Sequence, residues 1–122
     1  MDKVKIIILV VMSFLLVGCN TTKFNGNRTG NTSQFISDFT ILNTKMINEF
    51  ELVEGDIIDV NIFVEKGSLT IDFSDNNGEN VYKSDKAVTS NFQLRIDKSG
   101  VYNLTVTGSK CEGKVSFVKI ED

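Results

Sequence analysis

Apolar and polar residues alternate along most of the chain between residues 46 and 120, and turn-forming residues interrupt the alternation. Alternation with a period of two places successive side chains on opposite faces of a β-strand. The segment 57–65 shows it most clearly, with four apolar residues at every second position: Ile58, Val60, Ile62 and Val64. Similar segments are 46–53, 68–74, 79–83, 91–96, 101–107 and 114–120. The pattern predicts an all-β domain with little room for helices.

The turns between these segments suggest how the strands connect. Asp75-Asn76-Asn77-Gly78 is the clearest turn, because Asn-Gly accepts the positive φ angles of hairpin loops. Lys66-Gly67 predicts a second tight hairpin, between segments 57–65 and 68–74, and 109–113 predicts a turn into the last strand. The segment 36–44 is ambiguous between an edge strand and a helical turn.

Strands with one apolar face each cannot remain in a single flat open sheet, because that face would stay in contact with water. Two sheets packed face to face remove the problem. We therefore predict an antiparallel β-sandwich of about seven to eight strands, and a small closed barrel is the alternative. The residues outside the sandwich are expected to form a signal peptide helix and a disordered linker.

The first nineteen residues have a different character. Lys3 and Lys5 precede an apolar run from Ile6 to Val17, which is interrupted only by Ser13. A helix of these twelve residues would span about 18 Å, well short of the roughly 30 Å hydrocarbon core. A cleaved signal is therefore favoured. The alternatives are an ordinary secretory signal with an incidental cysteine, or an uncleaved anchor.

Leu16-Val17-Gly18-Cys19 resembles the lipobox of bacterial prolipoproteins. The resemblance implies that a signal peptidase recognises Leu16, Val17 and Gly18 and cleaves before Cys19. It also implies diacylglycerol on the Cys19 sulfur, sometimes with a further acyl chain such as palmitate on the new amino group. Two acyl chains make a stable membrane anchor, whereas a single acyl chain binds the membrane only marginally. The implied location is the extracytoplasmic side of a bacterial cell membrane. In a host with two membranes, Asn20 leaves the outer membrane open as the destination.

This resemblance divides the chain into a cleaved signal (1–18), a lipidated tether (19–34) and a sandwich domain (35–122). Residues 20–34 are polar apart from one large apolar side chain, which predicts a flexible coil of about 20 Å. Further along, Asp97 to Tyr102 reads Asp-x-x-Gly-x-Tyr. This motif is similar to a corner of immunoglobulin-like and pre-peptidase C-terminal-like sandwich modules, in which a tyrosine hydroxyl bonds back to the backbone.

Composition limits the chemistry that the chain can perform. No histidine occurs, so the usual general base near neutral pH and the commonest zinc ligand are missing. Losing Lys3, Lys5 and Asp2 with the signal reduces 13 basic and 16 acidic residues to 11 and 15. An acidic balance argues against nucleic acid and anionic lipid surfaces as partners. We expect no metal, no cofactor and no enzymatic activity.

Four groups of residues merit attention as sites. Five carboxylates, most of them on solvent-facing strand positions, could serve a glycan-cleaving enzyme or simply keep a sheet soluble: Glu49, Glu51, Glu54, Asp56 and Asp59. Oxygen-bearing residues around one turn suggest either calcium or, preferably, a solvated turn: Asp72, Asp75, Asn76, Asn77 and Glu79. Cys111 is expected to be a free thiol, because lipid occupies Cys19; it is either a reactive cysteine that could form an intermolecular disulfide or, preferably, an inert, half-buried residue in a loop or at a strand end. The aromatic residues Phe24, Phe35 and Tyr82 are either contacts for lipid, sugar or a partner, or packing residues.

The sequence thus predicts a lipid-anchored envelope protein with a non-catalytic binding domain, whose partner is an envelope protein or glycan. The competing hypotheses are a carboxylate-dependent enzyme acting on envelope polysaccharide and a structural subunit of an envelope complex.

Overall fold

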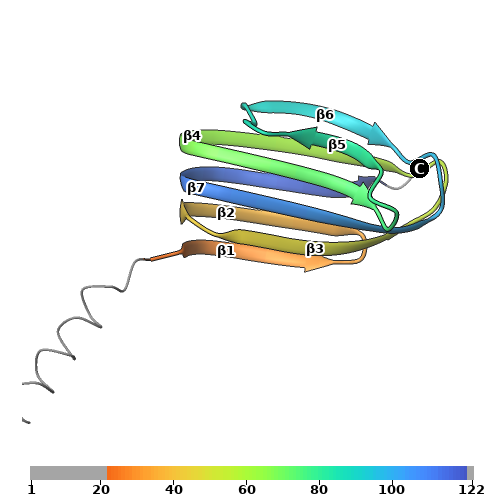
Figure 1. Cartoon of the computed structure of the whole chain (residues 1–122), viewed down its shortest axis with the longest axis horizontal. Helices are drawn as coiled ribbons and strands as arrows, with labels where there is room; N and C mark the ends of the chain where they lie inside the picture. The colour runs from red at the N-terminus through yellow and green to blue at the C-terminus, as the bar shows by residue number, and fades with distance from the viewer. Residues whose placement is uncertain (1–21, 121–122) are drawn as a thin grey trace, which may run out of the picture.

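The computed structural model describes residues 22–120, which form an all-β domain without a helix (Figure 1). The seven strands are β1 (Phe24–Asn31), β2 (Gln34–Leu42), β3 (Lys45–Leu52), β4 (Ile57–Asp75), β5 (Asn80–Ser84), β6 (Ser90–Arg95) and β7 (Gly100–Ile120). No segment of residues 22–120 has the helical length and hydrophobicity that a membrane span requires. The expected signal helix and the lipobox residues Leu16, Val17, Gly18 and Cys19 lie outside the described residues.

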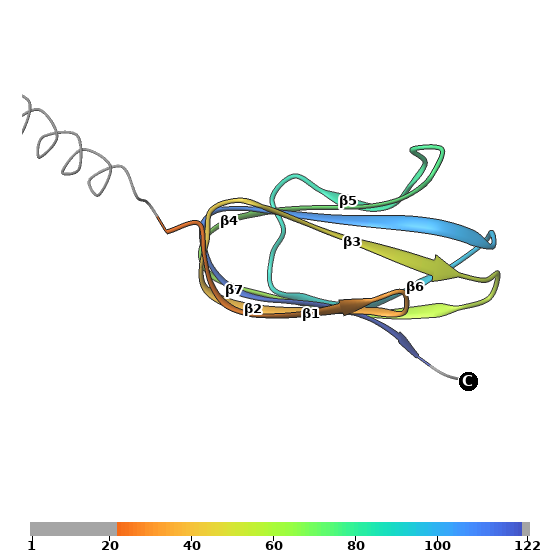
Figure 2. The same ribbon diagram turned by 90° about the horizontal axis from the view of Figure 1, so that it is seen from below.

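All strands pair antiparallel within one sheet, which folds over on itself into two layers (Figure 2). The first half of β4 lies between β6 and the second half of β7, and β7 continues to β2 and β1. The second half of β4 lies between β5 and the first half of β7, which also pairs with β3. The result is the predicted sandwich, with β4 and β7 running through both layers. The closed-barrel alternative is not what forms, because the sheet stays open at its edges.

The predicted hairpin at Lys66-Gly67 is wrong, and so is the predicted turn at 109–113. Both places are bends inside the long strands β4 and β7, which stay paired from Ile57 and Ile120 to Asp75 and Tyr102. The register shifts around Lys66, where Gly67 has a φ of +77°, and Lys110 opposite has a φ of +47°. Bulges of this kind bend both strands together. A glycine with positive φ is compatible with a hairpin turn, but Gly67 instead lies in a corner where β4 and β7 bend. We call this end of the sandwich the corner end.

The expectation of a flexible tether is wrong for residues 24–34, and the domain begins at Phe24 rather than at residue 35. Strand β1 pairs along its length with β2, although only Phe24 among its side chains is partly buried. Backbone hydrogen bonds, not apolar burial, therefore order this segment. Side chains support it, since Ser37 Oγ donates to Asn27 O at 2.9 Å and Asn48 Nδ2 donates to Asn31 O at 3.0 Å. The ambiguous segment 36–44 lies mainly in β2, an interior strand of its layer.

The core between the layers centres on aromatic rings. Phe73 is fully buried, and its ring centroid lies 5.4 Å from those of Phe50 and Phe117 and 5.7 Å from that of Tyr102. Offset and edge-on geometries at such distances are favourable. Phe35 is buried as well, which confirms its packing role. These rings come from both layers and hold them together.

Two predicted local structures are confirmed. The Asp75–Gly78 turn joins β4 to β5, with Gly78 N donating to Asp75 O at 3.1 Å and a φ of +83° at Gly78. The Tyr102 hydroxyl donates to Lys98 O at 2.5 Å, as the resemblance to sandwich modules implies. Both lie at the end opposite the corner, which we call the loop end.

Candidate functional site

The outer face of the layer formed by β1, β2, β6 and halves of β4 and β7 carries an exposed aromatic ring. Because alternation turns Ile62 inward, Phe63 points outward, and 48% of its surface is exposed. Its cross-strand neighbour on β7 is Lys114, which in turn pairs with Asp38 on β2. Among the large apolar side chains that residues 22–120 leave exposed, Phe63 is the only aromatic one, and we take its face as the candidate surface.

A hollow of about 550 Å³ lies on one side of Phe63. Its other lining combines apolar side chains, Lys114 and uncharged polar residues: Ile36, Ile62, Lys114, Asn61, Thr89, Ser90, Asn91 and Ser116. The Asn91 amide nitrogen donates to Asn61 Oδ1 at 2.6 Å and to Val60 O at 3.0 Å. The Asn61 amide donates in turn to Asp59 Oδ2 at 3.1 Å. This chain fixes the two amides in position.

A second hollow of about 450 Å³ lies on the corner side of Phe63, and Phe63 and Lys114 line both hollows. Three carboxylates from different strands line this second hollow: Asp38, Glu65 and Glu112. Asp38 Oδ1 accepts a bond from Asn27 N at 3.1 Å, and Glu112 lies 4.0 Å from Lys66 Nζ. We call the two hollows and the ring between them the Phe63 trough.

The chemistry of the trough suits a neutral polar ligand with apolar faces. An aromatic ring packs on the C–H face of a sugar, while amides and hydroxyls exchange hydrogen bonds with its hydroxyl or acetamido groups. Lys114 supplies one positive charge and the second hollow several negative ones, which disfavours a polyanion.

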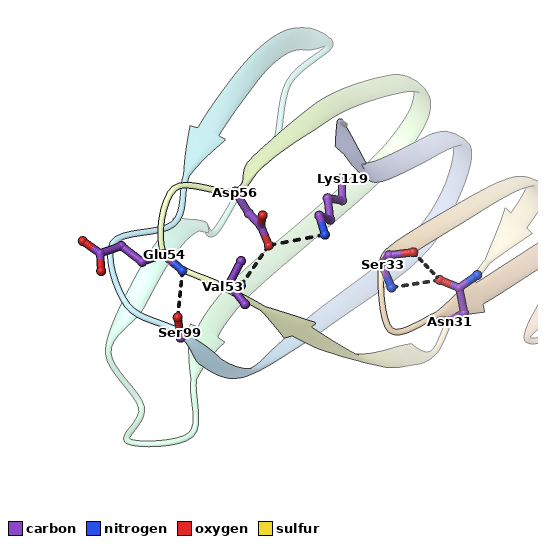
Figure 3. Close-up of polar contacts among 7 residues, drawn as sticks. All are labelled: Asn31, Ser33, Val53, Glu54, Asp56, Ser99 and Lys119. Atoms are coloured by element: carbon purple, nitrogen blue, oxygen red, sulfur yellow. Dashed lines mark hydrogen bonds and ion pairs between the residues drawn. The ribbon is translucent and has the colours of Figure 1, made fainter. Parts of the chain in front are cut away.

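The five predicted carboxylates do not gather into a catalytic pair. Glu49, Glu51, Glu54 and Asp59 lie on outward positions of β3, β4 and the loop between them. Asp56 instead closes that loop: its Oδ2 accepts Val53 N at 2.8 Å and lies 3.7 Å from Lys119 Nζ (Figure 3). The Glu54 side chain points away from it, and only its backbone N bonds to Ser99 Oγ, at 2.9 Å (Figure 3). Asp56 has the role of a turn cap.

The oxygen-rich turn at 72–79 is held by its own hydrogen bonds. Asp75 Oδ1 accepts the backbone N–H groups of Asn77 and Glu79, both at 2.9 Å. The Asp72 carboxylate accepts the hydroxyl of Ser74. Within residues 22–120 no three acidic or cysteine side chains lie close enough to hold a metal ion. Asp75 is thus occupied with the turn.

Cys111 is free and fully buried in the bend of β7. Burial raises the pKa of its thiol above the ordinary value, so the nucleophilic thiolate is disfavoured. The expectation of an inert thiol agrees with this geometry, although Cys111 is more deeply buried than expected.

The remaining predicted aromatic residues are packing residues. Phe24 and Tyr82 are partly buried against the core, and the Tyr82 ring lies 4.9 Å from Phe92, where it closes the gap between β5 and β6. Phe63 was not predicted as a site residue. Its signal was available, because it shares the solvent-facing side of 57–65 with Asp59 and Asn61.

Comparisons with known proteins identify no family. No family model matches the chain, and no curated protein matches it. Among solved structures, it is similar to a chain from the crystal structure of accessory secretory protein 1, 2 and 3 in Streptococcus pneumoniae. The TM-score is 0.37 and the identity 11%, over 84% of this chain and 91% of that chain. A likeness of this degree carries no conclusion about function.

Proposed function

We propose that this protein is a lipid-anchored bacterial envelope lipoprotein whose sandwich binds neutral glycan chains in the Phe63 trough without cleaving them. Its location rests on Leu16-Val17-Gly18-Cys19, which would place the mature chain at the outer surface of a membrane. The observation that carries the binding role is the exposed ring of Phe63 between two hollows whose linings combine apolar surface with amide, hydroxyl and carboxylate groups.

Anchoring explains how a shallow site is useful. A trough open to solvent buries little of a ligand and is expected to bind weakly. A tethered domain stays at high local concentration beside envelope polymers, and a polymer offers many copies of one sugar unit. Weak contacts then suffice through multivalency.

The test is a co-sedimentation assay with insoluble chitin, a neutral polymer of N-acetylglucosamine, and with purified peptidoglycan. Phe63→Ala is expected to weaken binding at least about tenfold, which corresponds to 1.4 kcal/mol. Ile47→Ala is the matched control, because Ile47 is 52% exposed on β3 in the opposite layer. Equal binding by the two variants would contradict the proposal. Soluble fragments released from peptidoglycan would support the enzyme hypothesis instead.

A further inference from the structure

Charge is distributed unevenly between the two ends of the sandwich. Five exposed lysines surround the corner end: Lys23, Lys45, Lys66, Lys86 and Lys110. Three acidic residues accompany them, namely Glu65, Asp85 and Glu112. The loops 53–56, 75–79 and 97–99 at the opposite end contain five acidic residues, Glu54, Asp56, Asp75, Glu79 and Asp97, against Lys98 in the loops and Lys119 beside Asp56. An overall acidic chain thus has one basic end.

Register and hydrogen bonds place these lysines together. Lys66 and Lys110 lie in the bends of β4 and β7, and Lys45 opens β3 opposite Thr107. Lys86 precedes Ala87, whose N–H donates to Leu69 O at 2.7 Å beside the β4 bend. Val88, which is 67% exposed, follows in the same loop. The corner end therefore presents lysines together with an exposed apolar side chain.

The described chain also begins at this end (Figure 1). Lys23 O accepts Asn43 N at 2.7 Å, which fixes Lys23 beside the turn between β2 and β3. Four residue steps separate Cys19 from Lys23, so the two Cα atoms lie at most about 14 Å apart. A lipid on Cys19 would thus keep the corner end near the head groups. Because this upper bound exceeds the Debye length of about 8 Å at physiological salt, the lysines attract an anionic surface strongly only when the domain lies closer than the bound.

We propose that the corner end is a second membrane contact, which docks on anionic phospholipid head groups and holds the sandwich upright with its loop end outward. This inference rests on the proposed lipid anchor. Lysines near an anionic surface are attracted to it, and acidic loops are repelled from it. Both effects favour the same orientation. The Phe63 trough then lies on the side of the domain, accessible to polymers in the envelope.

The experiment uses the processed, lipidated full chain in vesicles of phosphatidylcholine with one-third phosphatidylglycerol, compared with phosphatidylcholine alone. A fluorophore on Ser109→Cys at the corner end or Asn77→Cys at the loop end reports energy transfer to labelled lipid. On anionic vesicles we expect strong transfer from position 109 and weak transfer from position 77. On neutral vesicles, or in 0.5 M salt, the difference should shrink.

Charge variants identify the residues responsible. Lys23→Gln with Lys45→Gln removes two charges from the corner end, and Lys83→Gln with Lys98→Gln removes two charges elsewhere. The first pair of substitutions is expected to lower the equilibrium constant for docking about 30-fold, and the second pair to leave this constant unchanged.

Three outcomes would overturn the inference. The orientation could be the same on both vesicle types, the two variant pairs could behave alike, or the corner end could bind soluble glycerol phosphate polymer but not anionic vesicles. Failure of the anchor is distinguishable, because a chain without lipid would not float with neutral vesicles.

Discussion

The corner formed by β4 and β7 can be tested at Gly67. Gly67 has a φ of +77°, and a Cβ there would lie 2.6 Å from Ser109 O and closer still to Lys110 O. Gly78 provides a matched control, because its φ is +83° but a Cβ would meet nothing within 4 Å. Alanine at either position strains the backbone, at a cost of about 1–2 kcal/mol. Only alanine at Gly67 also forces two strands apart.

Overpacking against backbone adds about 1–3 kcal/mol, so we expect Gly67→Ala to lower the free energy of unfolding by about 2–5 kcal/mol and Gly78→Ala by about 1–2 kcal/mol. For a domain of this size, each kcal/mol corresponds to about 4–8 °C in Tm. Thermal and urea unfolding, followed by far-ultraviolet circular dichroism of the full chain, measures both variants. Equal destabilisation of the two would refute the tight approach of β4 and β7 at the corner.

Three further predictions concern single side chains. Tyr102→Phe removes the bond to Lys98 O and is expected to cost about 1 kcal/mol. Burial raises the pKa of Tyr102 in the folded state above the unfolded-state pKa of about 10. The Tyr102 hydroxyl therefore contributes fully to the free energy of unfolding below about pH 10, and this contribution is lost as the pH rises through the folded-state pKa. In urea titrations, the difference in the free energy of unfolding between wild type and Tyr102→Phe should shrink from pH 8 to pH 11. The Cys111 thiol should react with a maleimide more than about 100-fold slower in the native state than in urea, and fast native labelling would contradict its burial. Asn48→Ala removes the side-chain hydrogen bonds to Asn31 O and Gln34 O and is expected to lower the free energy of unfolding by about 1 kcal/mol. Amide hydrogen exchange should become faster in β1 to a greater extent than in β7.

The sequence predicts strands well where alternation is strong, because burial of one face dictates both strand and orientation. Segment 57–64 is such a case, with Ile58, Val60 and Ile62 buried as expected. The sequence does not show whether two successive strands are separate or continuous. A glycine with positive φ serves a hairpin and a bend equally, and the decision at Gly67 comes from pairing with β7, far along the chain.

Strand β1 was missed for a different physical reason. A search for apolar periodicity detects burial, and β1 is ordered by backbone pairing with β2, whose own apolar face carries the packing. The net charge of the chain likewise does not reveal that charge is segregated between the two ends of the sandwich. This segregation arises because bends bring Lys66 and Lys110 together with Lys45, which are distant in sequence. The mild acidity of the whole chain argued against anionic lipid, and the arrangement of its charges argues for it.

The lipid on Cys19 is the claim on which location, orientation and local concentration depend. Mass spectrometry of the N-terminal peptide from the native protein tests it directly. We predict a chain that begins at Cys19 and carries diacylglycerol on its sulfur. An unmodified Cys19 thiol, or a peptide that still contains Gly18, would contradict the account.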